Sequence, residues 1–204
     1  MIPDYIKIIL ASGSPRRREL LAGMGIPFDT ARPYPVDERY PESLAPHDVP
    51  AYLAELKSRA YPNALTDNQI LITADTVVIH GGRVIGKPKG REDAIEILGS
   101  LLGSTHEVTT GIAIRNRSAQ KVLSETARVV FGPLSPAEIE YYVDNFRPYD
   151  KAGAYGIQEW IGYVGIERIE GSFYNVMGLP TRLLYTGLTE FIKTHYTETI
   201  HKQT

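Results

Sequence analysis

Residues 8–24 read Ile-Ile-Leu-Ala-Ser-Gly-Ser-Pro-Arg-Arg-Arg-Glu-Leu-Leu-Ala-Gly-Met: an apolar run, a short turn and a run of helix-forming composition. The first run predicts a strand near residues 6–12, and the last predicts a helix over about 15–24. Ser14 fits the N-cap of that helix and Pro15 its first residue. A strand that passes through a tight turn into a helix points to a chain in which strands and helices interleave.

Three arginines follow Pro15. Arg16 and Arg17 fall in the first turn of the predicted helix, and Arg18 lies directly behind them. A helix N-terminus already carries partial positive charge, so cations are unfavourable there unless an anion lies beside them. Free backbone N–H groups and guanidinium groups converge at this point. Of the anions that could bind there, phosphate has the geometry that best suits both kinds of donor. The motif therefore indicates a phosphate-bearing ligand; the alternative is a solvated arginine cluster on a surface helix.

The composition is that of an ordinary globular protein, with 204 residues of which 43% are hydrophobic and 23% charged. This length suits one domain or two tightly joined lobes. The absence of cysteine excludes disulfides, thiolate metal sites and a cysteine nucleophile. The net charge of −2 argues against a nucleic-acid polymer as partner, because its binders usually carry a strong basic excess. A small phosphorylated ligand needs only a local basic patch.

The N-terminal residues 1–7 lack the apolar stretch of a signal peptide. No apolar run in the chain approaches the length that spans a membrane. We therefore expect a cytoplasmic protein with no membrane partner.

The rest of the chain alternates between predicted helices, strands and loops. Ser135-Pro136-Ala137-Glu138, for example, is a capping box with proline at the first helical position. Together with the first strand and helix, the predicted elements are a largely extended or loop segment 26–46, helix 47–61, strand 70–74, a hairpin of 77–79 and 84–85, helix 91–102, strands 106–114 and 122–131, helix 136–146, loop 148–158, strands 161–169 and 173–177, and helix 180–194. This order predicts an α/β or mixed α+β protein, without the glycine motif of a Rossmann fold or a P-loop.

Three acidic residues are candidates for chemistry. Asp75 follows the buried strand 70–74, and an acid at a strand end can hold a divalent metal or orient a water. The alternative for Asp75 is a turn or capping role. Asp37 and Glu38 lie in the proline-rich segment, where adjacent acids are usually solvated.

The basic and amide candidates lie on three segments. Lys57 belongs to helix 47–61, where a lysine is normally exposed. Lys87 stands between Gly86 and Pro88, which fix the backbone and make it a credible phosphate contact. Loop 150–158 combines small residues with Lys151 and Gln158, whose amide can read the edge of a base.

With these residues in view, the chain resembles the Maf family of nucleoside triphosphate pyrophosphatases, once described as septum-formation inhibitors. The matching stretches occur in order over about residues 6–187, and residues 195–204 form an uninformative tail of a single Maf-like domain, 1–204. They are Leu10 to Arg17, Ala74-Asp75-Thr76, Gly86-Lys87-Pro88, Asp150 to Gln158 and Gly178-Leu179-Pro180.

The resemblance implies a mixed α/β fold like that of the inosine triphosphate pyrophosphatases, with two lobes around a central cleft. It implies a hydrolase acting on acid anhydrides, which converts a nucleoside triphosphate to the monophosphate and pyrophosphate. A divalent cation such as magnesium, manganese or cobalt would assist. The role would be cleaning of the nucleotide pool with a link to cell-division arrest, and a homodimer is compatible with it.

The family's site residues map onto this sequence by motif. The general base falls on Asp75, the phosphate-binding serine and arginines on Ser12, Arg16 and Arg17, and the family lysines on Lys57 and Lys87. The acidic motif falls on Asp37-Glu38, with Glu38 the better candidate. We thus expect catalysis by Asp75, Glu38, Lys57 and Lys87, metal binding by Asp75, Glu38 and Asp37, and substrate binding by Ser12, Ser14, Arg16, Arg17, Thr76, Lys151 and Gln158.

Three positions look diagnostic of the substrate. Arg16, Thr76 and Gln158 match the dTTP/UTP type, whereas the 7-methyl-GTP type carries other residues there. One departure is Glu159-Trp160, where relatives often have glycine, and it bears on the shape of the base pocket. Two alternatives stay open: a nucleotide-binding regulator of septum formation without turnover, and a pyrophosphatase for another base such as 7-methyl-GTP.

Overall fold

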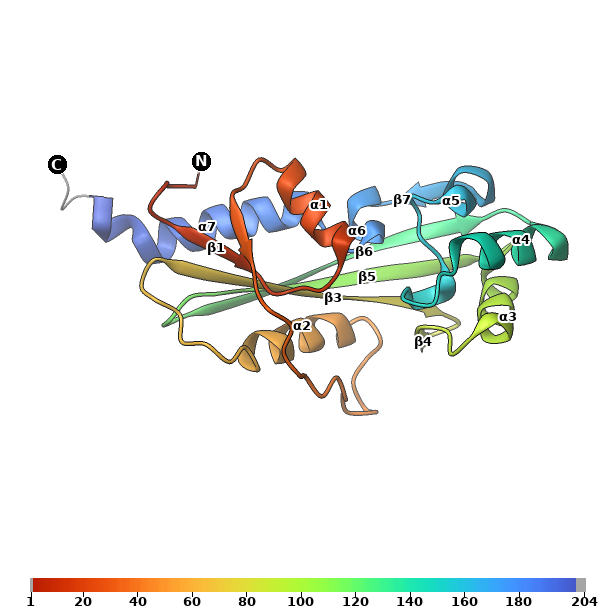
Figure 1. Ribbon diagram of the computed structural model, residues 1–204, viewed down its shortest axis with the longest axis horizontal. Coiled ribbons are helices and arrows are strands. Elements are labelled where there is room, and N and C mark those ends of the chain that lie inside the picture. Colours follow the sequence, from red (N-terminus) through yellow and green to blue (C-terminus); the bar gives the residue numbers. More distant parts are fainter. Residues whose placement is uncertain (1, 201–204) are drawn as a thin grey trace.

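The computed structural model describes residues 2–200 as a mixed sheet flanked by helices (Figure 1). Strands follow the order β2-β1-β3-β5-β6-β7, with β4 also paired to β3. The strands are β1 (Lys7–Leu10), β2 (Phe28–Thr30), β3 (Gln69–His80), β4 (Arg83–Ile85), β5 (Thr105–Arg115), β6 (Gln120–Phe131) and β7 (Ile166–Glu170). The helices are α1 (Pro15–Gly23), α2 (Val49–Arg59), α3 (Arg91–Leu101), α4 (Pro136–Phe146), the short 3-10 helix η1 (Ala152–Ala154), α5 (Trp160–Gly165), α6 (Phe173–Met177) and α7 (Thr181–Ile200).

The helices cover both faces of the sheet. In Figure 1, α1, α6 and α7 lie above the sheet, α2 lies below it, and α3, α4 and α5 gather at one end. Strand β1 runs parallel to β2 and β3, whereas β3, β5, β6 and β7 pair antiparallel. The expected mixed α/β class is confirmed.

The long strand β3 places alternate side chains on opposite faces of the sheet, as a strand must. Ile70 and Ile72 join the main core together with residues of α7. On the other face Thr73 donates a hydrogen bond to the carbonyl of Ala54 on α2 (2.6 Å). Odd-numbered residues of β3 therefore face α2, which fixes where Asp75 points.

Close contact between α2 and the sheet depends on Gly111 of β5, which lies directly opposite Asp75 in the ladder. A Cβ atom at Gly111 would lie 2.3 Å from the backbone of Pro50, nearer than any real contact. Glycine at this position lets the first turn of α2 rest on the sheet. The helix is thereby held close enough for its last turn to reach Asp75.

The neighbours of β3 leave a gap along one of its edges. Pairing with β1 ends at Leu10, opposite Ile72, and pairing with β4 begins only at Val78, opposite Ile85. In the described part of the chain no strand lies beside residues 73–77 on this side. This open edge positions the site.

The expectation that Asp75 ends a strand was wrong, because β3 continues through it to His80 and pairs with β5 along that length. The expected strand 161–169 begins as α5 and only then becomes β7. The expected strand 173–177 is α6, which Ser172 caps by accepting from the N–H of Asn175 (3.3 Å). A helix of 5 residues is too short to show its period in the sequence.

Two smaller differences concern the chain's ends and the proline-rich segment. Segment 26–46, expected to be largely extended or loop, contains the short strand β2, and the final helix extends beyond 194 to Ile200. Of the polar tail 195–204, residues 201–204 lie outside the described part. Among residues 2–200, no helix has the combined length and apolar character that crossing a membrane requires.

Candidate active site

Two adjoining hollows lie at the open edge of β3. The first, about 400 Å³, is lined in part by apolar residues such as Val77, Val84 and Met177, and it also takes in Asp75 and Gln158. The second, about 490 Å³, is lined by the turn 11–18 and by segment 30–36. Residues that border both hollows are mostly charged: Ser14, Arg16, Arg17, Glu38, Lys57, Lys87 and Asp150. Together the hollows have the size of a small-molecule site.

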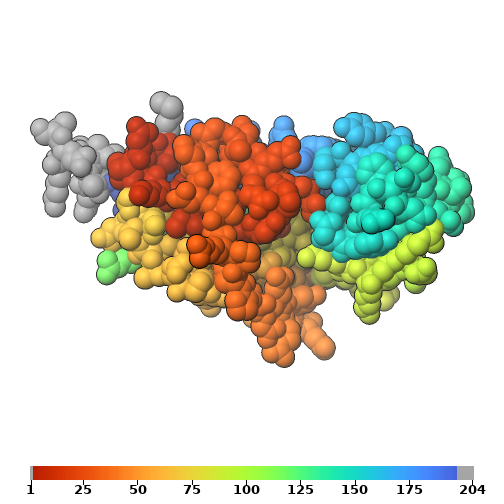
Figure 2. Space-filling model, viewed as in Figure 1, coloured from red at the N-terminus to blue at the C-terminus, as the bar shows by residue number. Residues whose placement is uncertain are grey.

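These hollows are formed by segments far apart in the sequence. Figure 2 shows the N-terminal region, in red and orange, meeting the teal segment around residue 150 on one face of the molecule. Arg16 Nη1 spans this junction to Asp150 Oδ2 at 3.4 Å. The α1 N-terminus and loop 150–158 therefore face each other across one site.

Arg17 fills the gap beside β3. Its Nε donates to the carbonyl of Gly178 (2.7 Å), Nη1 to the carbonyl of Ala74 (2.9 Å) and Nη2 to Oγ1 of Thr76 (2.9 Å). Burial lowers the pKa of Arg17, and the nearby charge of Asp75 acts in the opposite direction. The guanidinium thus joins α1, β3 and the end of α6, and most of its donors are committed to protein acceptors.

Arg16 differs from its neighbour because its partner is a half-exposed carboxylate. Asp150 is 61% exposed in its side chain and also accepts from Lys151 Nζ (2.9 Å). Partial burial raises the pKa of Asp150, but the hydrogen bond from Lys151 and the charge of Arg16 outweigh this, so the pKa is lowered overall. Arg16 is the first-turn arginine that an incoming phosphate can recruit.

The serines of the turn act on the backbone and on Arg17. Ser14 caps α1 by accepting from the N–H of Arg17 (3.5 Å), as the sequence predicts, with Pro15 as the first helical residue. Ser12 Oγ accepts from the N–H of Ser14 (3.3 Å) and from Arg17 Nη1 (3.4 Å). Both serines line the second hollow, beside the helix N-terminus.

The acidic centre is built around Lys57. Its Nζ lies 2.5 Å from Oδ1 of Asp75 and 3.1 Å from Oε2 of Glu38. Asp75 is buried, at 8% exposure, and comes from the sheet, whereas Glu38 comes from the loop before α2. The single ammonium group pairs with two carboxylates that converge on the hollows, so the three groups carry a net negative charge.

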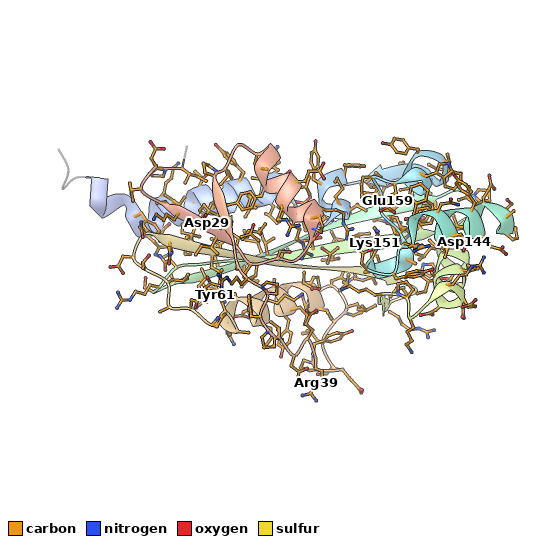
Figure 3. All side chains as sticks on the ribbon, in the orientation of Figure 1. Asp29, Arg39, Tyr61, Asp144, Lys151 and Glu159 are labelled. Atoms are coloured by element: carbon orange, nitrogen blue, oxygen red, sulfur yellow. The ribbon has the colours of Figure 1, made fainter. Side chains whose placement is uncertain are left out.

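Asp37 lies apart from this centre. Its carboxylate accepts from Arg39 Nε (2.8 Å), and this hydrogen bond holds the pKa of Asp37 below its ordinary value. Figure 3 shows Arg39 projecting from the body of the molecule. The structure therefore does not bring Asp37 to the carboxylates with which it was expected to bind a metal, because successive loop residues point in different directions.

The donor set fits a divalent cation that the substrate helps to bind. Among residues 2–200, no group of three or more acidic, histidine or cysteine side chains could hold a metal by itself. Asp75 and Glu38 nevertheless provide two carboxylates that meet on one ammonium group. Magnesium is commonly held by one or two carboxylates together with substrate phosphates, so these two residues suit it.

Lys87 is exposed at the edge of both hollows. Over the described range 2–200 it has no ion-pair or hydrogen-bond partner. The preceding carbonyl of Gly86 accepts from the N–H of Gly153 (3.1 Å), which ties its loop to loop 150–158. Lys87 is thus a cation held near the site with its charge available.

Loop 150–158 places Lys151 and Gln158 in different settings. Lys151 is buried, at 8% exposure, and its Nζ contacts Asp150 (2.9 Å) and Glu159 (3.0 Å), so the expected substrate contact is occupied by protein carboxylates. Gln158 lines the first hollow, and its Oε1 is buried with no partner in the chain from 2 to 200. An orphaned acceptor in a pocket wall is a place where a ligand donor can bind.

Thr76 lines the first hollow together with Gln158, and its hydroxyl is held by neighbouring groups of the protein. Its Oγ1 accepts from Arg17, lies 2.9 Å from Oγ1 of Thr110, and is 3.5 Å from the carbonyl of Gly178. Thr110, Gly178 and Glu159 were not among the expected site residues. Gly178 had a signal as part of the stretch Gly178-Leu179-Pro180, and Glu159 had one as part of the departure Glu159-Trp160. Thr110 had none, because its role depends on a contact with the distant Asn175.

The sequence matches the family model described as Maf-like protein over residues 7–191. The chain belongs to the Maf family. This confirms the resemblance drawn from the motifs, whose residues Ser12, Arg16, Asp75 and Gln158 each border one or both hollows of this Maf protein.

Several curated relatives cover nearly the whole Maf chain. The dTTP/UTP pyrophosphatase of Porphyromonas gingivalis is 52% identical over 187 residues, which are 91% of this chain and 94% of the relative. Proteins of the same description from Bacteroides fragilis and Christiangramia forsetii are 48% and 47% identical, covering 92% and 94% of this chain and 97% and 99% of their own.

Solved structures give more distant matches. The Ham1 protein of Staphylococcus aureus is 19% identical with a TM-score of 0.41, over 61% of this chain and 71% of its own. A nucleoside-triphosphatase, dITP/XTP pyrophosphatase, of Mycobacterium abscessus is 14% identical with a TM-score of 0.38, over 62% and 74%.

Proposed function

We propose that this protein hydrolyses nucleoside triphosphates, with dTTP and UTP preferred, to the monophosphate and pyrophosphate, and so removes nucleotides from the cellular pool. The observation that carries this is the place of Asp75. Its carboxylate lies in the first hollow, beside the charged border that this hollow shares with the second. A nucleotide with its base in the first and its terminal phosphates in the second would present its α-phosphate near Asp75.

The first hollow suits a nucleobase. Its apolar wall can pack against an aromatic ring, and the unpartnered Oε1 of Gln158 can accept a hydrogen bond. Uracil and thymine present an N3–H donor between two carbonyl oxygens, and a glutamine amide offers the complementary acceptor and donor. The names of the curated relatives, dTTP/UTP pyrophosphatase, support the same bases.

The second hollow suits the phosphates. Arg16 and Lys87 border it with charge available, and the N-terminus of α1 points backbone N–H groups toward it. Arg17 supports this end from behind, by fixing α1 against β3. These groups would neutralise the charge that builds on the leaving pyrophosphate, which is usually the largest catalytic contribution in phosphoryl chemistry.

The chemical step follows from the same arrangement. Asp75 orients a water and takes its proton, the water oxygen bonds to the α-phosphorus, and the bond from that phosphorus to the bridging oxygen breaks. Lys57 keeps the Asp75 carboxylate in place at 2.5 Å. A divalent cation, when held by Asp75 and Glu38, would add charge neutralisation at the phosphates.

A panel of nucleotides tests this proposal. Pyrophosphate release would be measured from dTTP, UTP, CTP, GTP, ITP and 7-methyl-GTP, with magnesium, manganese or cobalt and with chelator. We expect the highest kcat/KM for dTTP and UTP, and loss of turnover with chelator. Preference for a guanine nucleotide would contradict the base assignment, and tight binding without pyrophosphate release would favour a regulator of septum formation.

A further inference from the structure

Glu159 occupies a partly buried position behind the base pocket. Its Oε1 lies 3.0 Å from Lys151 Nζ, and its Oε2 accepts a hydrogen bond from the hydroxyl of Tyr142. Its side chain is only 19% exposed and borders neither hollow. Figure 3 labels Glu159 and Lys151 near each other, beside α4 and α5. A carboxylate so placed acts on the site through its neighbours.

The contacts of Glu159 converge on the turn that carries Gln158. The hydroxyl of Tyr142, which donates to Glu159, accepts from the N–H of Gly156 (3.0 Å). The N–H of Glu159 itself donates to the carbonyl of Gly156 (3.0 Å). The backbone of this turn is therefore hydrogen-bonded on both sides of Gln158, and Glu159 takes part in both arrangements.

The side chains of Gln158 and Glu159 also lie beside the same glycine. A Cβ at Gly156 would lie 2.9 Å from Nε2 of Gln158 and 2.8 Å from Cδ of Glu159. The two side chains thus occupy adjoining space that the glycine leaves open. The amide that packs beside Glu159 is the one whose Oε1 is buried without a partner at the first hollow.

Lys151 links Glu159 to Asp150 through two ion pairs. Arg16, Asp150, Lys151 and Glu159 alternate in sign, and each contacts the next at 3.4, 2.9 and 3.0 Å. When Arg16 turns to a phosphate, Asp150 still has Lys151 as a partner. Lys151, which also lines the first hollow, is held between two carboxylates and so acts as a cross-link within the loop.

We propose that Glu159 is a positioning residue for base recognition, which holds Lys151 and Tyr142 and thereby presents the amide of Gln158 to the nucleobase. The inference rests on the proposed function, because it concerns how the same site reads its substrate. It predicts that losing Glu159 weakens binding of the base and leaves binding of the phosphates intact.

The test separates the two ends of the site with two probes. UMP carries the base and one phosphate, and inorganic tripolyphosphate carries phosphates alone. Affinity for each is followed by the fluorescence of Trp160, which is the single tryptophan of the chain and directly follows Glu159. The variants are Glu159→Ala and Glu159→Gln, and the control is Glu190→Gln, which removes an exposed acid paired with Lys121 (2.6 Å).

We expect Glu159→Ala to raise the Kd for UMP at least tenfold and to leave the Kd for tripolyphosphate within twofold of wild type. Glu159→Gln, which keeps a hydrogen-bond acceptor for Tyr142, should raise the Kd for UMP by a smaller factor. In turnover of UTP, Glu159→Ala should raise KM by a similar factor with kcat within threefold. Glu190→Gln should match wild type throughout.

An unchanged Kd for UMP in Glu159→Ala, or an equal rise for both probes, would overturn the inference. If Glu159→Ala does not fold, the same titration is made with Tyr142→Phe, which removes one of the two side-chain contacts of Glu159. An unchanged Kd for UMP in Tyr142→Phe would equally overturn the inference. Absence of hydrolysis by the wild-type protein would instead refute the proposed function, and the UMP titration would still report on Glu159.

Discussion

Lys57 Nζ lies 2.5 Å from Oδ1 of Asp75, so a cation from the last turn of α2 meets a carboxylate from the middle of β3. The side chains are only 16% and 12% exposed, which makes the pair poorly screened by solvent. Removing one partner of such a pair leaves an uncompensated charge. The pair therefore joins the stability of this part of the fold to the chemistry of the site.

Replacing Asp75 by Asn is expected to lower kcat for dTTP at least a hundredfold, or by about 3 kcal/mol in the barrier. The amide keeps the shape of the carboxylate but can neither take a proton from water nor bind a cation well. Steady-state pyrophosphate release measures the loss, and circular dichroism checks that the fold is retained. A folded variant with more than a tenth of the wild-type rate would refute the role of Asp75 as the base.

The adjacent arginines should respond differently to substitution. Arg17→Ala leaves the carbonyls of Ala74 and Gly178 without their donors, and we expect it to lower the free energy of unfolding by about 2–4 kcal/mol. Arg16→Ala removes a contact to the half-exposed Asp150, so its effect on stability should stay within about 0.5 kcal/mol.

Urea denaturation without ligand measures the free energy of unfolding of both arginine variants. Titration with tripolyphosphate measures the phosphate affinity of the folded variants. We expect Arg16→Ala to weaken that affinity strongly, because its guanidinium is the one that can turn to the ligand. Equal destabilisation by the two substitutions, with phosphate affinity untouched in Arg16→Ala, would show that the cluster is structural.

Replacing Gln158 by Glu should lower the preference for dTTP and UTP. The substitution removes an amide donor and adds a negative charge next to the base carbonyls, with a penalty of about 1–3 kcal/mol. The measurement is the ratio of kcat/KM for dTTP to that for 7-methyl-GTP in both proteins. An unchanged ratio would mean that Gln158 does not read the base.

The buried His106 should make stability depend on pH. Burial, and to a smaller extent the nearby His80, lower the pKa of His106 to about 4. The pKa of an unfolded histidine is about 6.5. Between the folded and the unfolded pKa, the unfolded state therefore binds a proton that the folded state does not. Stability should therefore be complete above about pH 6.5 and decline as the pH falls toward 4, by about 3 kcal/mol from this residue.

The comparison is with His106→Gln, which keeps a polar group near the hydroxyl of Tyr155, now 2.8 Å from Nε2. Urea denaturation at a series of pH values from 7 to 4 gives the unfolding free energy of each protein. The two curves should approach each other as the pH falls, because the variant lacks this proton uptake. Parallel curves would show that His106 is not the source.

Helices and strands whose start and end are marked by neighbouring residues in the sequence could be predicted. The capping box of Ser135 and Glu138 forms as expected, and α4 spans Pro136–Phe146. Strand β3 was cut short in the prediction because aspartate is disfavoured in strands. Its partner β5, with Gly111 opposite Asp75, carries the ladder through this position, and that pairing joins segments far apart in the chain.

Local capping and motif order were enough to predict the turn of Ser12 to Arg17, the residue types of a phosphate site and membership of the Maf family. Which charges remain available depends instead on contacts made in the folded protein. Adjacent residues of a helix point in different directions, so Arg17 meets the carbonyl of Gly178, 161 positions away, while Arg16 meets Asp150. Tertiary packing likewise turned Glu38 toward Lys57, and the fold of loop 150–158 buried Lys151 between two carboxylates.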